Sequence, residues 1–426
     1  MNILVDQSGY ALMNMGDRAM LQMALQRLQD LWPHSKIQVF TTAPEILQQA
    51  CPGVRPCSPL GRYFWSVPIS HRFHETLATK AATSAVTDLE WQWRNRFPET
   101  ATAVIRSRSG NKPQRMEPLE EFIESVRCSD LVISTGGGYI TDSFQDHACR
   151  VLNTLELAHH LGKPTALVGQ GLGPIENPIL YNRAKAVLPK VDLITLREKR
   201  AGLPLCSKLG ISPHRRLVTG DDAIELAYNH RPESLGNGLG VNLRVANYSG
   251  VNQSLLDGIR ATLQTAARQL NAPMLPIPIA HSEEESDPTA IRQLLLGYDD
   301  TSDGGASLDT PIKVIQQAGR CRVTVTGSYH AAVFSLSQGV PVIGLAKSDY
   351  YVDKFAGLAE QFGIGCEILL MTDRDFQEQL ATNIHSLWHN AEIIHNSLLE
   401  SAREQIQLGH IAYQKLSQLV EFQCKS

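Results

Sequence analysis

The sequence predicts a two-domain α/β protein built on parallel sheets. Short apolar or β-branched runs alternate with longer amphipathic stretches, which is the pattern of repeated βα units. The chain has 426 residues, which is too long for one ordinary hydrophobic core and favours two domains. Several of the predicted strands end in glycine-rich turns, where a backbone can approach a ligand closely.

The first predicted domain covers residues 1–230. Amphipathic stretches at Ala19–Leu31 and Ala148–Leu161 predict two of its helices. Residues 229–238, with the sequence NHRPESLGNG, concentrate turn formers and place the domain boundary there. The predicted strands of this domain are Ile3–Val5, Ile37–Thr41, Leu131–Ser134, Thr165–Val168, Leu193–Leu196 and Leu217–Thr219.

The second predicted domain covers residues 239–372 and repeats the βα alternation. Residues 373–426 have a helical pattern, and we expect these C-terminal helices to pack back across the domain junction. The predicted strands are Leu239–Leu243, Met274–Ile279, Arg322–Thr326 and Val340–Leu345.

Residues 58–115 do not fit the alternation and are interpreted as an insertion in the first domain. The segment has no clear strand and carries three tryptophans, Trp65, Trp91 and Trp93, two of them in a helix predicted at Thr83–Phe97. Insertions on α/β scaffolds often form lids or substrate walls, so we expect the acceptor on this side. A purely structural role is the alternative.

A basic stretch lies at the end of this insertion. Arg106, Arg108, Lys112 and Arg115 occur there without an acid among them. The stretch could attract an anionic substrate or a membrane surface, which would make the protein peripherally membrane-associated. A solvated loop is the alternative.

Composition and charge exclude several classes of protein. The formal net charge is −4 and the isoelectric point is about 6.4, so nothing in the overall charge favours a nucleic acid partner. The eight cysteines form no CxxC pair, which argues against a zinc site and favours a reducing compartment. No signal peptide and no apolar run of roughly 18 residues is visible. We therefore expect a cytoplasmic protein without a metal or a cofactor.

The first candidate motif is SGYALMNMGDRAM, residues 8–20, which follows the first predicted strand and leads into a helix. Ligands bind at the carboxyl ends of parallel strands, where helix N-termini present free N–H groups. We expect Asn14, Gly16 and Asp17 to line the cleft between the domains. Helix capping is the structural alternative for Asn14 and Asp17.

Two further motifs place glycines at strand ends. DLVISTGGGYITD, residues 130–142, contains Gly136, Gly137 and Gly138, which are interpreted as a ligand-facing turn whose amide groups could form a nest for an anion. A tight strand-to-helix turn is the alternative. GQGLGPIENP, residues 169–178, adds Gly171 to the same predicted edge. Together these strand ends mark one face as the binding face.

The most specific motif is VTVTGSYHAAVFSLSQGVPVIGL, residues 323–345. A buried strand ends at Gly327, and an apolar helix begins at once with Ser328, Tyr329 and His330. The imidazole of His330 is therefore expected near a helix N-terminus, where bound anions are favoured. A structural histidine is the alternative.

Other polar residues follow predicted strands. Arg197 and Arg244 could bind a carboxylate or a phosphate with two parallel hydrogen bonds. His281 follows another strand and is expected to enter the cleft. The remaining candidates of this kind are Asp221, Asp222, Lys347 and Lys354.

Taken in order and spacing, these motifs resemble the polysaccharide pyruvyl transferase family. The resemblance rests on residues 14–20, 130–142, 169–174, 194–198, 218–223 and 326–345. It implies a pair of Rossmann-like domains in a GT-B-like arrangement that face a cleft. It also implies transfer of pyruvate from phosphoenolpyruvate to two hydroxyls of a sugar as a cyclic ketal.

The resemblance also suggests roles for three residues. His330 matches the histidine of the family's Arg-Leu-His motif, a candidate for acid catalysis and phosphate contact. Arg244 is similar to a second anion-binding arginine, and Asp17 is the candidate for acceptor contact or general base. Ser328 and Tyr329 stand where the family commonly has Arg-Leu, and the loss of that guanidinium leaves open how the donor is held.

Two other functions remain open at this stage. One is a GT-B-type glycosyltransferase or sugar-nucleotide enzyme that uses the same cleft. The other is a non-catalytic relative that binds a sugar or a nucleotide.

Overall fold

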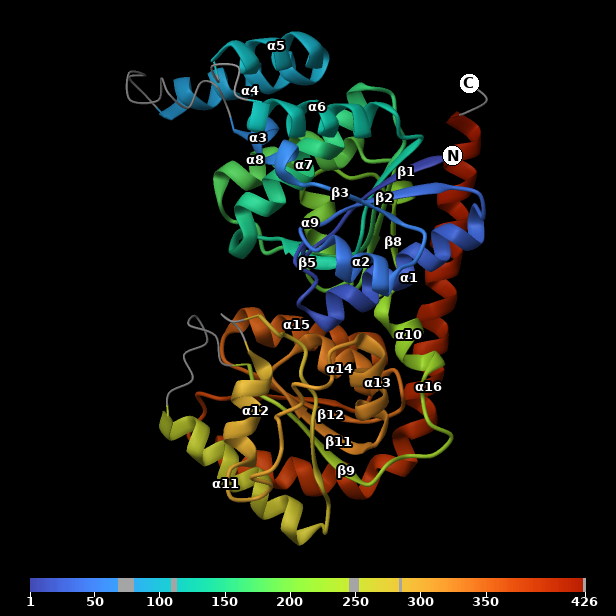
Figure 1. Ribbon diagram of the computed structural model, residues 1–426. Coiled ribbons are helices and arrows are strands. Elements are labelled where there is room, and N and C mark those ends of the chain that lie inside the picture. Colours follow the sequence, from blue (N-terminus) through green and yellow to red (C-terminus); the bar gives the residue numbers. More distant parts are fainter. Residues whose placement is uncertain (68–79, 109–112, 245–252, 283–285, 424–426) are drawn as a thin grey trace.

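The computed structural model describes residues 1–67, 80–108, 113–244, 253–282 and 286–423. The chain forms two α/β halves, each built around one parallel sheet and stacked one above the other in Figure 1. The predicted fold class, two Rossmann-like domains, is confirmed.

The N-terminal sheet has eight strands in the described part of the chain. Their order is β3-β2-β1-β4-β6-β7-β8, with β5 paired to β6. Ile3 in the central strand lies opposite both Ile37 and Leu131. Because the chain moves outward from β1 in one direction and then returns to β4 on its other side, the sheet has a topological switch point between these strands. The strands are β1 (Asn2–Asp6), β2 (Lys36–Phe40), β3 (Arg55–Cys57), β4 (Leu131–Ser134), β5 (Gly137–Ile140), β6 (Thr165–Leu172), β7 (Leu193–Leu196) and β8 (Arg216–Val218).

Helices cover both faces of this sheet (Figure 1). The first helix begins where the side chain of Asn14 accepts hydrogen bonds from the N–H groups of Gly16 and Asp17, at 2.9 and 3.2 Å. The helices are α1 (Met15–Leu31), α2 (Pro44–Ala50), α3 (Leu60–Ser66), α4 (Lys80–Arg96), α5 (Pro98–Arg108), α6 (Pro113–Arg127), α7 (Gln145–His160), α8 (Pro178–Val187), α9 (Gly202–Lys208) and α10 (Ala223–Asn229), with short 3₁₀ turns at Asp142–Phe144, Leu188–Lys190 and Pro213–Arg215.

The C-terminal sheet has the order β10-β9-β11-β12-β13 and is also parallel. Its switch point lies between β9 and β11, which carry Arg244 and Gly327 just after their carboxyl ends. The strands are β9 (Gly238–Asn242), β10 (Met274–Pro276), β11 (Cys321–Thr326), β12 (Val342–Ala346) and β13 (Cys366–Leu370), and the helices are α11 (Gln253–Gln269), α12 (Asp287–Leu295), α13 (Pro311–Gly319), α14 (Tyr329–Leu336) and α15 (Asp349–Phe362).

One continuous helix, α16 (Phe376–Gln423), replaces the several C-terminal helices that the sequence suggested. It runs beside both halves, in red in Figure 1. In the C-terminal half, His395 contacts the carbonyl oxygen of Gly339 at 3.0 Å. In the N-terminal half, the ring of Tyr413 is buried against the guanidinium of Arg27. The helix therefore connects the two cores.

The sequence analysis did not predict three of the strands. β3 is a short edge strand that contains Pro56, β5 begins with two glycines, and β13 ends the second sheet at its edge. Proline and glycine weaken strand patterns, and edge strands are buried less completely, so their sequences carry a weaker signal. The glycine run interpreted as a turn is thus partly a strand, because Gly137 and Gly138 open β5.

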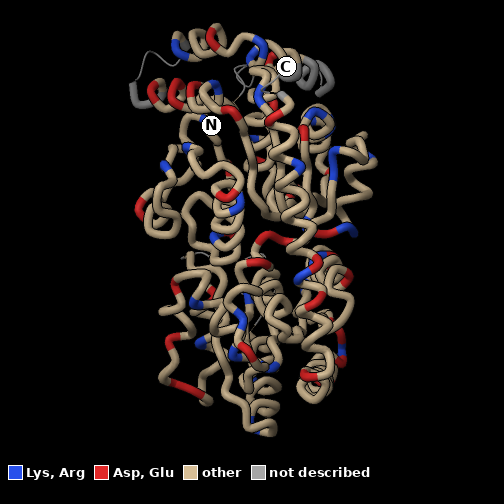
Figure 2. The backbone as a smooth tube through the Cα atoms, turned by 90° about the vertical axis from the view of Figure 1, so that its right-hand side faces the viewer, with Lys and Arg blue, Asp and Glu red and all other residues tan. Residues whose placement is uncertain are grey.

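The described parts of the insertion fold as helices packed on the N-terminal half. Within it, the basic stretch is mostly helical rather than a loop, because α5 ends at Arg108 and α6 begins at Pro113. Arg106 forms an ion pair with Glu120, and residues 109–112 lie outside the described residues. Figure 2 shows acidic and basic residues interspersed in both halves. None of the described helices combines the length and apolar character that a membrane crossing needs.

Candidate active site

The carboxyl ends of the two sheets meet at the junction between the halves. The N–H of Met15, at the start of α1, donates to the carbonyl oxygen of Ile279 at 2.8 Å. The N–H of His281 donates to the carbonyl oxygen of Met13 at 2.9 Å. The loop after β1 is therefore anchored to the segment after β10, and the two switch points face one another.

The first turns of α1 and α14 are in direct contact at this junction. A methyl group on Gly16 would overlap the imidazole ring of His330. Glycine at this position lets the two helices approach closely, so Gly16 is explained by packing against a site residue. Asn14 caps the same helix, as the alternative interpretation of this residue predicted.

His330 and Asp221 form the centre of the site. Their Nε2 and Oδ2 atoms are 3.6 Å apart, and neither atom has a hydrogen-bond partner among the described residues. Burial acts to raise the pKa of Asp221, but the neighbouring His330 and Arg197 outweigh it, so the pKa is lowered. Asp221 is therefore a carboxylate that can orient and stabilise a protonated imidazole.

Arg197 reaches the same carboxylate from the end of β7. Its Nη1 atom lies 3.7 Å from Oδ2 of Asp221, and its guanidinium carbon lies 4.0 Å from the ring centroid of Tyr329. The side chain is only 5% exposed, and its Nε has no hydrogen-bond partner in the described part of the chain. A buried donor of this kind is left without the hydrogen bond that such groups normally make.

Two of the predicted glycines make room for this arginine. A methyl group on Gly138 would lie 2.8 Å from Nη2 of Arg197, and one on Gly171 would lie 2.6 Å from Nε. The other two glycines of the run pack elsewhere: Gly136 against Met20 and Gly169, and Gly137 against Tyr139 and Ser8. The structure thus links Gly138 and Gly171 to the site through Arg197.

Asp17, in the first turn of α1, interacts electrostatically with His330 from the N-terminal half of the molecule. Burial raises the pKa of its carboxyl group, while His330, a hydrogen bond from Ser8 and the charges of Arg244 and Arg197 oppose the shift. A carboxyl group with a raised pKa can take or give a proton closer to neutral pH than an exposed aspartate.

Two lysines complete the cationic lining. Burial, followed by repulsion from Arg197 and Arg244, lowers the pKa of Lys354 to about 7, although Asp17 opposes this. Burial and the charge of Arg244 lower the pKa of Lys347 to about 8. The ammonium of Lys354 lies 4.2 Å from the ring centroid of Tyr350. Such lysines regain their protons when an anion binds beside them.

The turn before α14 places the remaining predicted residues. A methyl group on Gly327 would lie 3.3 Å from the backbone nitrogen of Arg244, so this glycine keeps the two strand ends close. Ser328 is buried, and its N–H donates to the hydroxyl of Thr326 at 2.8 Å. These contacts bring Arg244 into electrostatic range of Asp17 and both lysines.

The structure does not bring two of the considered residues to the centre. His281 interacts electrostatically with Asp287, Asp309 and Arg18, none of which belongs to the cluster around His330. Asp222 turns away from its neighbour Asp221 and pairs with Arg27 at 2.5 Å. The expectation that the His281 side chain enters the site is not supported by these contacts.

Sequence reasoning missed a buried network that supports the loop after β1. Asp6, the last residue of this strand, pairs with Arg62 from the insertion and accepts a hydrogen bond from Tyr10 at 2.7 Å. The ring of Tyr10 also lies under the Arg62 guanidinium. An aspartate that ends the first strand was the signal available, since it stands two residues before the motif that begins at Ser8.

The fold and the site together define a GT-B-type α/β enzyme, with two Rossmann-like domains whose switch points meet at one cationic cluster. A family model described as "Polysaccharide pyruvyl transferase" matches residues 14–349. The chain belongs to this family and is a transferase. No curated protein matches the sequence.

Solved structures share the fold at low sequence identity. The chain is similar to a putative UDP-N-acetylglucosamine 2-epimerase from Listeria monocytogenes, with 12% identity, 95% of this chain and 90% of that chain covered, and a TM-score of 0.53. It is also similar to HepE from Anabaena, solved in complex with UDP, with 11% identity, 99% of each chain covered and a TM-score of 0.53. The UDP-GlcNAc 2-epimerase from Neisseria meningitidis has 11% identity and a TM-score of 0.53, with 99% and 100% covered.

Proposed function

We propose that the protein transfers pyruvate from phosphoenolpyruvate to two hydroxyls of a sugar, as a ketal, in the biosynthesis of a cell-surface polysaccharide or glycoconjugate. The observation that carries this proposal is the convergence of cations on His330 and Asp221 at the junction of the two sheets. Family membership supports the class of reaction. We place the reaction in the cytoplasm, where phosphoenolpyruvate is made.

Phosphoenolpyruvate is a small donor with a carboxylate and a phosphate, so its site needs several cations. Arg197 offers a buried Nε donor, and Arg244, Lys347 and Lys354 surround the same space. Arg197 comes from the opposite half of the molecule and lies on Tyr329. We infer that it supplies the guanidinium that Ser328 does not.

The chemistry then needs one acid and one base. Protonated His330 gives its proton to the methylene carbon of the donor, which becomes a methyl group and leaves a cationic centre at the adjacent carbon. A sugar hydroxyl oxygen attacks that carbon, and its proton passes to Asp17. The bond from carbon to phosphate oxygen then breaks, and phosphate leaves with its electron pair. The second hydroxyl attacks the same carbon and closes the ketal, and its proton passes to the departing phosphate. Asp17 then returns its proton to His330 and restores the starting state.

Asp221 does not touch the reacting atoms in this scheme. Its carboxylate lies 3.6 Å from Nε2 of His330 and can fix the orientation of the ring, which makes it a positioning residue. Cations around the departing phosphate stabilise the charge that develops on it.

A second candidate is an enzyme that acts on a nucleotide sugar through the same site. The observation that favours it is Ser328 in place of the family's arginine, in a fold shared with HepE, which was solved with UDP.

The decisive experiment offers phosphoenolpyruvate with a panel of sugars and sugar nucleotides and measures phosphate release together with the mass of the ketal product. His330→Asn is the control for enzyme-dependent release. Absence of phosphate release with every acceptor would contradict the proposal. A rise in melting temperature with a nucleotide sugar but not with phosphoenolpyruvate would favour the second candidate.

A further inference from the structure

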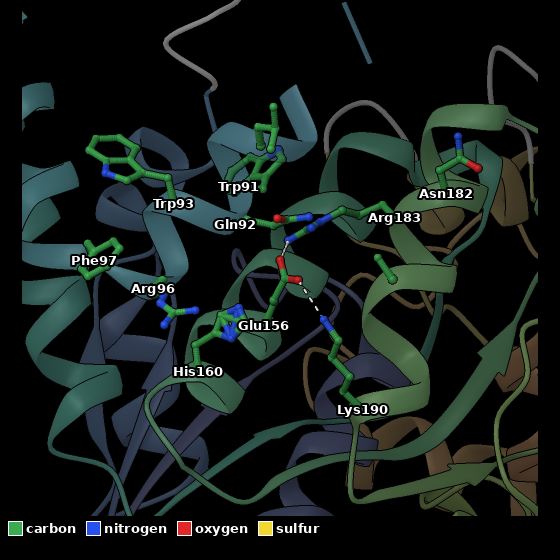
Figure 3. A pocket seen from close by; sticks show the side chains of 12 residues that line it. Trp91, Gln92, Trp93, Arg96, Phe97, Glu156, His160, Asn182, Arg183 and Lys190 are labelled. Carbon is green, nitrogen blue, oxygen red and sulfur yellow. Dashed lines mark hydrogen bonds and ion pairs between the residues drawn. The ribbon is translucent and has the colours of Figure 1, made fainter. Parts of the chain in front are cut away.

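A pocket of about 750 Å³ lies on the N-terminal half, between the insertion helix α4 and the helices α7 and α8 (Figure 3). Its lining includes Trp91, Trp93 and Phe97 from the insertion and Arg183 from α8. The site at His330 shares none of its described lining residues with this pocket.

The pocket lies near the amino ends of the strands of the N-terminal sheet, whereas His330 lies near their carboxyl ends. Glu156 and His160 are at the end of α7, just before β6 begins, and Lys190 precedes β7. The amino ends of parallel strands lie at the sheet edge away from their carboxyl ends, where the active site is. β6 has eight residues and spans roughly 26 Å at about 3.3 Å per residue. A ligand that reaches both places must be a chain of several units.

Aromatic rings form one wall of the pocket. Phe97 is 51% exposed although it is a large apolar side chain, and Trp93 is only partly buried. Figure 3 shows both rings on the α4 side of the pocket. Exposed aromatic rings in a concave site are typical of ligand contact, because the apolar face of a sugar ring can pack flat on them.

The charged lining carries a surplus of positive charge. Arg96, Arg183 and Lys190 stand against Glu156, the one acid among the described lining residues. Glu156 already pairs with Arg183 and, at 3.4 Å, with Lys190 (Figure 3). It also accepts a hydrogen bond from Asn95 at 2.7 Å. Arg96 has no ion-pair partner in the described part of the chain.

We propose that this pocket binds an acidic segment of a glycan, with a sugar ring packed on Trp93 and Phe97 and a carboxylate paired with Arg96 and Lys190. The surplus cations favour an acidic over a neutral saccharide, and the concave shape with amide groups from Gln92 and Asn182 favours a saccharide over a flat membrane surface. The glycan is the remote part of the acceptor, and in this respect the site rests on the proposed function.

The test measures binding of oligogalacturonate and of a malto-oligosaccharide of matched length by calorimetry. We expect wild-type protein to bind the acidic chain, and Arg96→Gln and Phe97→Ala to weaken it by about tenfold each, which corresponds to about 1.4 kcal/mol. Arg127→Gln and Phe144→Ala are matched controls outside the pocket, since Phe144 is 50% exposed. These controls should bind as the wild type does.

Several outcomes would overturn this inference. They are absence of oligogalacturonate binding, equal binding of the neutral chain, or binding that both pocket variants leave unchanged. Binding of phosphatidylglycerol vesicles that depends on Arg96 and Phe97, without glycan binding, would assign the pocket to a membrane surface instead.

Failure of the proposed function gives a different result. His330→Asn should abolish turnover and leave oligogalacturonate binding intact. If phosphoenolpyruvate is never turned over but the pocket variants still lose glycan binding, the reaction assignment is wrong and the pocket assignment stands. With an active enzyme, Arg96→Gln should raise KM for long acidic acceptors without changing kcat for short ones.

Discussion

The guanidinium carbon of Arg197 lies 4.0 Å from the centroid of the Tyr329 ring, and this contact joins the two halves of the molecule at the candidate active site. Arg197 directly follows strand β7 of the N-terminal sheet, and Tyr329 begins the helix that carries His330. The ring, where the family commonly has leucine, holds a cation beside the histidine. Under the proposed function, this contact would let Arg197 bind the donor in place of an arginine at position 328.

This contact predicts how donor affinity depends on Arg197. Arg197→Lys should weaken phosphoenolpyruvate binding by about tenfold to a hundredfold, because a lysine loses the planar fork and the stacking on the ring. Tyr329→Phe keeps the ring and should bind nearly as the wild type does, whereas Tyr329→Leu should not. Calorimetric titration measures all three dissociation constants. Wild-type affinity in Tyr329→Leu would contradict the role given to the ring.

Replacement of His330 should separate catalysis from binding. His330→Asn removes the proposed acid, and we expect kcat/KM to fall by about 10² to 10⁴. The melting temperature should change little, since asparagine keeps atoms at the positions of Cβ, Cγ and Nδ1, which are the ones packed against Gly16. Phosphate release and thermal unfolding measure the two effects. Turnover within a few-fold of the wild type would exclude His330 as the acid.

The depressed pKa of Lys354, about 7, predicts a pH dependence of donor binding. Below pH 7 the ammonium is charged and attracts the donor. Above pH 7 it is neutral, so affinity should fall between pH 7 and 8, and binding at pH 8 should take up protons. Calorimetry in buffers of different ionisation enthalpy measures this uptake. Lys354→Met should bind weakly, with a flatter pH profile.

The low pKa of Lys354 also predicts how the stability of the folded protein depends on pH. Donor affinity should fall as the pH rises, whereas folding stability should increase. Its folded-state pKa lies below the ordinary lysine value of 10.5, so the folded protein binds fewer protons than the unfolded chain between pH 7 and that value. Wild-type stability should therefore rise with pH in this window. Lys354→Met should raise the melting temperature at pH 7 and reduce the slope. An unchanged slope would show that Lys354 is charged in the free protein.

A buried ion pair between α1 and the loop after β8 predicts a stability effect away from the site. Arg27 pairs with Asp222 at 2.5 Å and with Glu225 at 2.7 Å. Arg27→Met leaves a buried carboxylate without its partner and should cost about 3 to 5 kcal/mol of unfolding free energy at pH 8. Urea unfolding measures this loss. Arg127→Met, at an exposed pair, should cost under about 1 kcal/mol.

The loss in Arg27→Met should shrink at low pH. Burial already raises the pKa of Asp222 to about 6 with Arg27 in place, and removal of that arginine raises it further. A carboxyl group with a raised folded-state pKa gains stability for the folded protein as the pH falls through that pKa. Unfolding at pH 5 should therefore show a smaller loss, and Arg27→Met combined with Asp222→Asn should recover part of it at pH 8. Equal losses at both pH values would argue against this explanation.

Local sequence patterns were sufficient for much of the fold. Central strands such as Leu131–Ser134 and Leu193–Leu196 are buried apolar runs, and the structure has them at the predicted residues. The strand β3, with Pro56, and β5, with its initial glycines, were missed because their residues are poor strand formers and only pairing with a neighbour makes them strands. Asp221 and Asp222 look alike in sequence, yet one faces His330 and the other faces Arg27.

By itself the sequence determined that the chain alternates strands and helices and that its motifs stand at the carboxyl ends of strands, since both follow from periodicity and from local turn chemistry. Only the tertiary structure decided which strand ends meet. Arg197 and Tyr329 are 132 positions apart along the chain, and Gly16 and His330 are 314 apart. Their contacts depend on strand order and on the packing of one sheet's edge against the other. These contacts join residues that are far apart in the sequence, so no short stretch of sequence can predict them.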